Sequence, residues 1–457
     1  MNLENFEDPE TTTKTVRILV YPNITFGKDL EKDSYIQVIK KQITLLNQIR
    51  KDLWFYLILP KNVPSLAFDN VTQLLLDIPT HPPTMRAHFD TQAIKKLCSR
   101  DLDFDLVMSH LPEHTYDLKN VLYNVTQHVP KFFGYCHWFD FKKVANWPMN
   151  SFKKNILGIL EMDRCYLNTE SQKKLVLDEA KETFSDETIS KLDKILTVQH
   201  LGVDKKDIIK TIQHPKGGQY DKSKKKIIVF NHRPDTYKHY KEFLNVCDKL
   251  YEKRQDFNVW VPLASKPDRD YVITDSGDKD FYYKMLQTSY IGYSPKQTYG
   301  GWSVATTDGM MNGVPYLMYD ADYYRELWNE GIFVKNDKEL LDKLDFYLNN
   351  EYIRNDLSED GLAHIRKRLV FKKEIEKMSE YIDELIKKLP IVKKSEKLKE
   401  MTKWIKKEGS ITKKHIIERL GWGVGIKWTQ YRRTLLTNPK IYDTMAKEPI
   451  YKWKDNK

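Results

Sequence analysis

Cysteine is scarce in this chain of 457 residues, and long apolar runs are missing altogether. The four cysteines, at positions 98, 136, 165 and 247, form no C-x-x-C pair, which argues against a zinc knuckle and a disulfide framework. No segment approaches the roughly 18–20 consecutive apolar residues that cross a bilayer. Residues 1–14 are polar and acidic, unlike a secretory signal. The sequence therefore predicts a soluble, cytoplasmic protein with no membrane partner and no structural zinc.

Several common catalytic signatures are missing as well. The chain has no G-x-x-x-x-G-K-[ST], no H-E-x-x-H and no G-x-S-x-G, which argues against P-loop, zincin and nucleophile-elbow chemistry. His110, Glu113 and His114 share the segment SHLPEHT, but this segment is expected to be a loop and no fourth ligand is evident. We therefore expect neither a metal nor another cofactor.

Charge is distributed unevenly along the chain. The sequence has 75 Lys and Arg residues against 64 Asp and Glu residues, a formal net charge of +11. Residues 391–457 contain 18 of the basic residues and 7 of the acidic ones, so this segment carries the whole excess. A basic module on a neutral body favours a polyanionic partner, most often nucleic acid. A lysine-rich, solvated tail is the alternative.

Apolar runs and helical segments alternate twice before this basic module. Such alternation predicts two doubly wound parallel sheets, because parallel strands need crossover helices. Gly217, Gly218 and the lysines that follow favour a linker, so we expect domains at 1–213 and 214–390. Paired domains of this kind bind ligands in a cleft at the carboxyl ends of their strands. The expected strands are 15–21, 53–59, 104–109, 131–136, 164–167, 195–199, 227–230, 258–262, 289–293 and 315–319, and the expected helices include 240–253, 281–288, 302–312, 337–349 and 372–388.

The basic module at 391–457 has a different pattern. Three helices and a β-hairpin in so short a segment are typical of a winged helix, whose third helix often enters the major groove of DNA. A small helical oligomerisation or capping module is the alternative. The expected elements are helices at 396–407, 413–420 (capped by residues 410–412) and 427–437, then strands at 441–442 and 450–453, and the expected DNA-binding residues are Lys413, Lys414, Lys427, Arg432 and Arg433.

Two segments of the second β/α series have residues suited to binding a diphosphate. Arg233 and Lys238 follow a buried strand and precede a helix, where cations can bind phosphate oxygens. Gly300 and Gly301 permit a ligand to approach the backbone closely, and the helix that follows would direct free N–H groups at phosphates. Asp308 lies about two turns into that helix. Its carboxylate can accept hydrogen bonds from both hydroxyls of a ribose.

These residues carry a family resemblance. The segment DGMMNGVP at Asp308–Pro315 resembles the second half of the signature of the retaining GT-B glycosyltransferases, in which two acidic residues are separated by seven positions. Asp308 stands at the family's ribose-binding acidic position, and Gly300 replaces its first acidic residue. HRPDTYK at 232–238 resembles the family's G-R-x-x-x-x-K loop, and HLGVD at 200–204 resembles its N-G-V-D turn. The resemblance implies a GT-B fold and a nucleotide-sugar co-substrate linked to UDP.

The resemblance extends over roughly Val16 to Lys388 and implies further site residues. The loop after the first strand stands where the family brings backbone close to the donor phosphates. His137 follows an expected strand, where the family has a functional histidine that can bind the donor sugar or stabilise charge on the leaving diphosphate. The alternative is a histidine packed among its aromatic neighbours. The predicted donor-binding residues are Asn23, Gly27, Arg233, Lys238, Gly300, Gly301, Trp302, Ser303, Thr307 and Asp308, and the predicted catalytic residues are His137 and Asp140.

The sugar-transfer residues and the basic module together predict an acceptor. We expect a retaining glycosyltransferase that moves a hexosyl or pentosyl group to hydroxymethylated pyrimidines in double-stranded DNA. In combining sugar transfer with DNA binding, the chain is similar to bacteriophage modified-base glycosyltransferases. This similarity would place it in the cytoplasm of the host cell. The target base would be extruded from the duplex to reach the cleft. One alternative is a glycosyltransferase that builds a cell-surface glycan or glycoprotein. The other is a non-catalytic, sugar-nucleotide-sensing DNA-binding protein, which the replacement at Gly300 permits.

Overall fold

The chain is known from a computed structural model that describes part of its length. The described residues are 15–24, 30–61, 63–66, 68–77, 89–98, 104–126, 129–141, 150–203, 225–234, 236–262, 269–274, 279–389, 403–408, 410–412, 441–443 and 450–453. They divide into two compact units, one comprising Met1–His137, Lys153–Cys165 and Glu376–Lys457, and the other Trp138–Phe152 and Tyr166–Ile375. The domain limits expected from the sequence stay predictions.

A seven-stranded sheet has the strand order β3-β2-β1-β4-β5-β6-β7. Its strands β3, β2, β1, β4 and β5 run parallel to their neighbours. Its central strands are buried along nearly their whole length, as expected for a sheet covered on both faces. The edge strand β3 was not expected, because half-buried polar residues interrupt its apolar pattern. The strands are β1 (Val16–Tyr21), β2 (Leu53–Pro60), β3 (Val71–Leu76), β4 (Leu106–Ser109), β5 (Lys131–Tyr135), β6 (Arg164–Leu167) and β7 (Leu196–Val198).

Helices connect these strands, and side-chain caps fix where several of them begin. The Asp33 carboxylate accepts hydrogen bonds from the N–H groups of Tyr35 and Ile36 at the start of α1. Thr169 caps α5 through the N–H of Gln172. The helical elements are η1 (Leu30–Lys32), α1 (Ser34–Ile49), α2 (Thr91–Cys98), η3 (Pro112–His114), α3 (Thr115–Thr126), α4 (Asn150–Ile159), α5 (Glu170–Ala180) and α6 (Asp186–Ile195).

A six-stranded, fully parallel sheet has the order β10-β9-β8-β11-β12-β13. The chain builds outward from β8 to β10 on one side and from β11 to β13 on the other, so the strand order reverses between β8 and β11. Such a reversal is the usual ligand-binding position of a doubly wound sheet. The strands are β8 (Lys226–Val229), β9 (Phe257–Trp260), β10 (Val272–Ile273), β11 (Ile291–Ser294), β12 (Tyr316–Tyr319) and β13 (Ile332–Val334).

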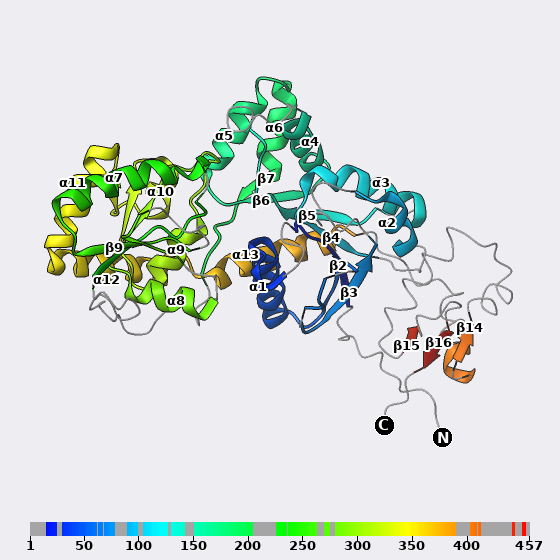
Figure 1. Cartoon of the computed structure of the whole chain (residues 1–457). Coiled ribbons are helices and arrows are strands. Elements are labelled where there is room, and N and C mark those ends of the chain that lie inside the picture. The colour runs from blue at the N-terminus through cyan, green and yellow to red at the C-terminus, as the bar shows by residue number, and fades with distance from the viewer. Residues whose placement is uncertain are drawn as a thin grey trace. The chain divides into compact units, whose positions relative to one another are not determined.

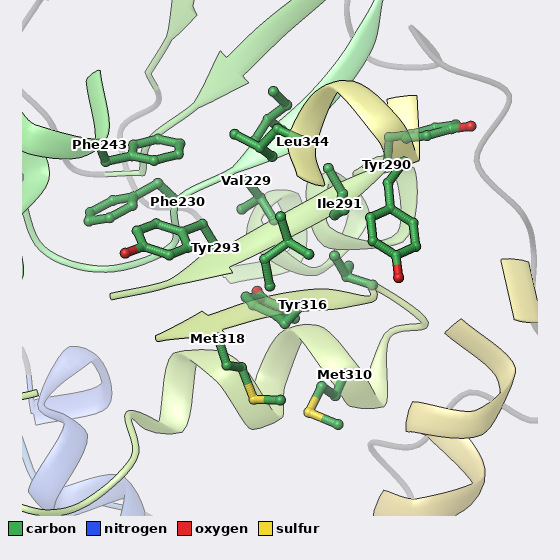
Figure 2. Close-up of a cluster of buried hydrophobic side chains, with 14 of the residues drawn as sticks. Val229, Phe230, Phe243, Tyr290, Ile291, Tyr293, Met310, Tyr316, Met318 and Leu344 are labelled. Carbon is green, nitrogen blue, oxygen red and sulfur yellow. The ribbon is translucent and has the colours of Figure 1, made fainter. Parts of the chain in front are cut away.

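Helices cover both faces of the six-stranded sheet, with α7 packed beside α11 and α9 beside α12 (Figure 1). An apolar cluster fills the space beneath them, and Figure 2 shows Phe230, Phe243 and Tyr293 gathered at one end of it. The rings of Phe230 and Phe243 stack with their centroids 4.9 Å apart. The helical elements are η5 (Thr236–Lys238), α7 (Tyr240–Lys253), α8 (Lys279–Thr288), α9 (Val304–Met311), α10 (Asp322–Leu327), α11 (Asp337–Asn349), α12 (Glu351–Arg368) and α13 (Phe371–Lys387).

A small antiparallel sheet lies in the basic segment, with the order β14-β16-β15. The hairpin expected from the sequence is confirmed as β15 (Ile441–Asp443) and β16 (Ile450–Trp453). Residues 410–412 form strand β14 (Ser410–Thr412), paired with β16, which the sequence did not predict. Their expected role as a helix cap stays a prediction, because the helix that would follow lies outside the described residues. Residues 403–408 are helical, in agreement with the first expected helix. The helices expected at 413–420 and 427–437 lie outside the described residues, so the winged helix stays a prediction.

Candidate functional site

The loops after β8 and β11 meet at the strand-order reversal of the six-stranded sheet. Ile228 and Val229 align with Ile291 and Gly292, so both strands end at the same edge. The loop after β8 contains Arg233 and Lys238, and the loop after β11 continues into α9. Parallel pairing therefore brings the two sequence segments predicted to bind a diphosphate to one edge.

A hydrogen bond joins these two loops. The Lys238 ammonium donates to the Oε1 atom of Gln297, which lies in the loop that leads to α9. The Gln297 side chain is buried, its Nε2 atom donates to the Pro295 carbonyl at 2.8 Å, and its backbone N–H donates to the Tyr323 hydroxyl at 2.7 Å. Lys238 also lies over the Tyr237 ring, 5.2 Å from its centroid. The lysine is thus positioned by groups that the sequence did not identify.

Arg233, the other predicted cation, has a different environment. Its side chain is exposed, so it is accessible to a ligand in solution. His232, the residue before it, is buried, and burial followed by the nearby Lys238 charge holds the pKa of His232 well below its usual range. The strand end therefore carries its positive charge on Arg233 and Lys238, whereas His232 is neutral.

Gly300 has a backbone conformation that explains why it replaces an acidic residue. Its φ is +70°, in the left-handed region, where side chains other than glycine are strained. Its carbonyl accepts a 2.7 Å hydrogen bond from the Thr169 hydroxyl, and a Cβ atom would come within 3.1 Å of the Gln172 Cα. The left-handed backbone and the close packing against the start of α5 thus disfavour the acidic side chain of the resembled family. At Gly301 a Cβ would make ordinary contacts, so packing does not require that glycine.

Trp302 is a core residue rather than an open stacking platform. It is 4% exposed, and its ring centroid lies 5.0 Å from that of His200. His200 donates from Nδ1 to the Asn168 carbonyl at 2.7 Å, which fixes the ring against which Trp302 packs. The indole Nε1 of Trp302 is buried and has no hydrogen-bond partner in the described part of the chain. Its N–H is the polar group that Trp302 can offer to a ligand.

The N-terminus of α9 offers backbone N–H groups to a ligand. Ser303 is the N-cap, yet its hydroxyl makes no capping hydrogen bond. The Thr306 N–H donates to the Ser303 carbonyl at 3.0 Å, which leaves the N–H groups of Val304 and Ala305 for a ligand. Thr307 does not face outward as a donor, because its hydroxyl donates to the Val304 carbonyl at 2.8 Å. Thr306 is held in the core by a 2.6 Å hydrogen bond to Ser294. The amides and Ser303 are therefore better placed than Thr307 to meet phosphate oxygens.

Asp308 lies on α9 beside a buried polar network. The Tyr282 hydroxyl is 3.5 Å from Asp308 Oδ2, at the long limit of a hydrogen bond. Asn231 donates to the Tyr282 hydroxyl at 3.0 Å and to the Ala305 carbonyl at 2.7 Å, and it accepts from the Tyr316 hydroxyl at 2.9 Å. Burial, and then the Asp308 charge, hold the pKa of both tyrosines well above the usual range, so both stay protonated. The network supports a half-buried carboxylate that remains accessible.

Two glycines make room for one of these tyrosines. A Cβ at Gly309 would lie 2.1 Å from the Tyr316 hydroxyl oxygen, and one at Gly292 would lie 2.5 Å from the Tyr316 ring. The glycine at position 309 is therefore explained by the large Tyr316 ring, which Figure 2 shows above Met310 and Met318.

The seven-stranded sheet has its own strand-order reversal, between β1 and β4. Tyr21 aligns with Ser109 there, and Asn23 and His110 follow these strand ends. Asn23 is 4% exposed, and its Oδ1 has no hydrogen-bond partner among the described residues. His137 follows the neighbouring strand β5. The structure thus gathers Asn23, His110 and His137 at adjoining strand ends.

His137 is uncharged at neutral pH. Its side chain is half-buried, and desolvation lowers its pKa from 6.5 to about 3. His110 is fully buried, and burial followed by the neighbouring His137 lowers the pKa of His110 as well. A neutral imidazole can bind a hydroxyl but cannot offset the charge of a leaving diphosphate. Of the two roles expected for His137, the electrostatics favour the first.

Asp140 is buried and paired with an indole. The Trp138 Nε1 donates to Asp140 Oδ1 at 3.1 Å. The Trp138 ring in turn lies 3.7 Å from the Tyr299 ring, measured between centroids. Asp140 therefore fixes an aromatic side chain that contacts the loop leading to α9.

The remaining predicted site residues lie outside the described part of the chain. These residues are Gly27, Lys413, Lys414, Lys427, Arg432 and Arg433. Within the described residues, no three or more His, Cys, Asp or Glu side chains come together as a metal-binding group. Among the helices that the structure describes, none is both long and apolar enough to cross a membrane.

The two sheets define the class of fold. Two doubly wound parallel α/β sheets, each with a strand-order reversal, form the GT-B architecture expected from the sequence, and comparison with solved structures confirms this fold. Neither a protein-family model nor a curated protein sequence matches the chain.

The individual structures that resemble the chain are remote in sequence. HepE from Anabaena, in complex with UDP and glucose, is 9% identical, with a TM-score of 0.58 over 81% of this chain and 100% of HepE. A glycosyltransferase from Rickettsia africae is 15% identical, with a TM-score of 0.58 over 82% of this chain and 99% of its own. S. aureus TarM, in complex with fondaparinux, alpha-GlcNAc-glycerol and UDP, is 14% identical, with a TM-score of 0.50, and the match spans 65% of this chain but only 58% of TarM. At these identities the likeness shows the fold.

Proposed function

We propose that the chain is a glycosyltransferase that transfers a hexosyl or pentosyl group from a UDP-sugar and retains the anomeric configuration. The hydrogen bond from Lys238 to Gln297 carries this proposal, because it joins a strand-end cation to the loop that leads to the open N-terminus of α9. This arrangement suits a diphosphate. The complexes of HepE and TarM with UDP support the choice of nucleotide.

Each of the predicted site residues discussed above has a role in this proposal. Arg233 and Lys238 neutralise the diphosphate as the bond to the sugar breaks, together with the first-turn amides of α9. Asp308 accepts hydrogen bonds from the ribose hydroxyls, supported by Tyr282. His137 contributes a neutral hydrogen bond to the transferred sugar. Asp140 holds Trp138 in place.

The direct test is product formation from UDP-glucose and UDP-GlcNAc. UDP release would be followed with the full chain and duplex DNA that contains either 5-hydroxymethylcytosine or cytosine. We expect a mass increase of one sugar on the hydroxymethylated strand only. Absence of UDP release with every sugar donor and acceptor would reject the enzymatic function.

We propose that the acceptor is hydroxymethylated duplex DNA, bound by the basic segment 391–457. The concentration of positive charge in this segment and its three-stranded antiparallel sheet support a compact nucleic-acid-binding module. Replacing Lys413, Lys414, Lys427, Arg432 and Arg433 by Gln removes five phosphate-binding charges. The Michaelis constant for a long duplex should then rise and depend less on salt, with a slope reduced by about 0.9 for each lost phosphate contact. Equal constants for long and short duplexes in both proteins would reject docking.

A glycan or glycoprotein acceptor is the second candidate. TarM, solved with UDP and alpha-GlcNAc-glycerol, favours it because that ligand carries a sugar on a polyol. Transfer to a glycan or polyol acceptor, with none to either DNA, would select this alternative. Binding of UDP-sugar without any turnover, together with DNA binding, would instead select the non-catalytic sensor.

A further inference from the structure

Two histidines at neighbouring strand ends form a pair that the proposed chemistry uses only in part. The Nδ1 atom of His110 and the Nε2 atom of His137 are 2.8 Å apart, a hydrogen-bond distance. Their ring centroids are 5.1 Å apart, and the ring planes differ by 19°. The loops after β4 and β5 hold the two residues, and Ser109 aligns with Gly134 just before them.

Gly134 shows why these strand ends come so close. A Cβ atom at this position would lie 1.7 Å from the Ser109 carbonyl oxygen, so only glycine fits. Aromatic rings confine His137 on other sides, with the Tyr135 centroid at 4.6 Å and the Tyr35 centroid at 4.9 Å. The local packing therefore fixes both the separation of the histidines and the orientation of the His137 ring.

The hydrogen bond permits only two arrangements of protons. Each neutral imidazole has one N–H group and one bare nitrogen, so either His110 donates from Nδ1 or His137 donates from Nε2. The Nε2 atom of His110 is buried and has no hydrogen-bond partner in the described part of the chain. If His137 donated, His110 would carry its proton on this Nε2 and bury an unpaired N–H group. Unpaired buried donors are rarer than unpaired acceptors, so donation by His110 is favoured.

We propose that His110 is a positioning residue that fixes His137 in the tautomer protonated on Nδ1, so that His137 offers a directed N–H donor to its ligand. The identity of that ligand, an oxygen of the transferred sugar, rests on the proposed glycosyltransferase function. The tautomer itself does not depend on that function. His110 thereby acts on the reaction through His137 and need not touch the substrate.

The tautomer can be measured directly by NMR. Full-length protein with ¹⁵N-labelled histidine would be examined at neutral pH, and the His137 ring signals would be assigned by their loss in His137→Gln. We expect the proton on Nδ1 in the wild-type protein. In His110→Phe the His137 ring keeps an aromatic neighbour but loses the N–H donor of His110. The His137 proton should then exchange between Nδ1 and Nε2. A wild-type proton on Nε2, or unchanged signals in His110→Phe, would overturn the proposal.

Kinetics provide an independent readout with matched amides. The amide N–H of Asn superimposes on the histidine Nδ1 position and that of Gln on the Nε2 position, so His110→Asn should rescue the pair and His110→Gln should not. We expect kcat to fall about tenfold in His110→Phe and His110→Gln, and KM for the UDP-sugar to change less than about twofold in both. In His110→Asn, kcat should stay within about threefold of wild type.

The Asn and Gln variants keep the test decisive if His110→Phe does not fold. Equal activity of the Asn and Gln variants, with equal His137 spectra, would overturn the positioning role. If the wild-type protein turns over no UDP-sugar, the proposed function fails, whereas the NMR spectra still decide the role of His110.

Discussion

The strand-end edges of the two sheets differ in the kind of polar group that they present. At the six-stranded sheet, Arg233 is exposed, Lys238 is held by Gln297, and Asp308 is half-buried. At the seven-stranded sheet, His110 and His137 are uncharged. One edge presents charge and the other presents neutral hydrogen-bonding groups. Doubly wound sheets of similar topology thus suit two different ligand chemistries.

The physical reason for the difference is burial. A charged side chain retains its charge only where water or a counter-charge stabilises it, and desolvation neutralises groups that lack both. The charged edge can therefore supply binding energy to an anionic diphosphate, whereas the neutral edge supplies direction to hydroxyl groups. Each prediction below alters one edge and leaves the other intact.

The largest effect is expected from removing charge at the six-stranded edge. Lys238→Ala should lower kcat/KM for a UDP-sugar about a hundredfold, which corresponds to about 2.7 kcal/mol, because a charge-assisted contact to the diphosphate is lost. Arg233→Ala should also lower kcat/KM for the UDP-sugar. Steady-state UDP release measures both variants.

Lys241→Ala is the matched control for this prediction. Lys241 is exposed on α7, three residues beyond Lys238, and the proposed site gives it no contact with the diphosphate. Its variant should keep wild-type kinetics. If Lys238→Ala also kept them, the six-stranded edge would lose its assignment as the diphosphate site.

The next effect concerns the neutral edge and appears in stability rather than turnover. The pKa of His137 is about 3 in the folded chain and 6.5 as an ordinary histidine. Above pH 7 both states are neutral and His137 contributes no pH dependence. As the pH falls below 6.5, the unfolded chain binds a proton that the folded chain does not, so stability decreases. At pH 5 this loss should be about 2 kcal/mol.

Denaturant unfolding at pH 7.5 and pH 5 measures this dependence. His137→Gln removes the titrating group, so its stability should decrease less between the two pH values than that of the wild type. His200→Gln is the control variant. It removes a half-buried imidazole from the other unit and leaves His137 in place. An identical pH dependence in wild type and His137→Gln would show that the seven-stranded edge is not held neutral.

A smaller effect is expected at Asp308. Asp308→Asn keeps the size of the side chain but removes the charge that accepts two ribose hydroxyls, so the affinity for UDP should fall about tenfold, or about 1.4 kcal/mol. Calorimetric titration with UDP measures it. Asp342→Asn, on the exposed face of α11, should bind UDP like wild type. Wild-type affinity in Asp308→Asn would leave this carboxylate as a solvated helix residue.

The charged edge was largely predictable from sequence, and its support was not. Arg233, Lys238 and Asp308 belong to short motifs whose spacing indicates their chemistry. Gln297 and Tyr282 belong to no local pattern, because their partners are brought to them by strand pairing and helix packing. Tyr282 looks like an ordinary apolar position of a helix, and only its hydrogen bond to Asn231 reveals another role.

The fold shows the same division between local and long-range information. Central strands such as β1, β4 and β12 were predicted because their apolar runs are continuous. Strand β3 was missed because an edge strand is partly polar, and β14 was missed because its pairing partner lies about 40 residues further along the chain. His137 was predicted by resemblance, whereas its partner His110 was considered only as a metal ligand.

The smallest expected effect tests why the charged edge lacks a second carboxylate. Gly300→Glu restores the acidic residue of the resembled family, yet it places a side chain at φ +70° and against Gln172. The left-handed conformation alone costs about 1 kcal/mol. We therefore expect Gly300→Glu to lower the thermal midpoint by about 2–4 °C and to leave turnover no higher than wild type. Gly301→Ala, with ordinary space for its Cβ, serves as the control and should keep the wild-type midpoint. A more active Gly300→Glu with an unchanged midpoint would mean that the loop can accept the acid, and that the glycine reflects the choice of sugar rather than the packing against α5.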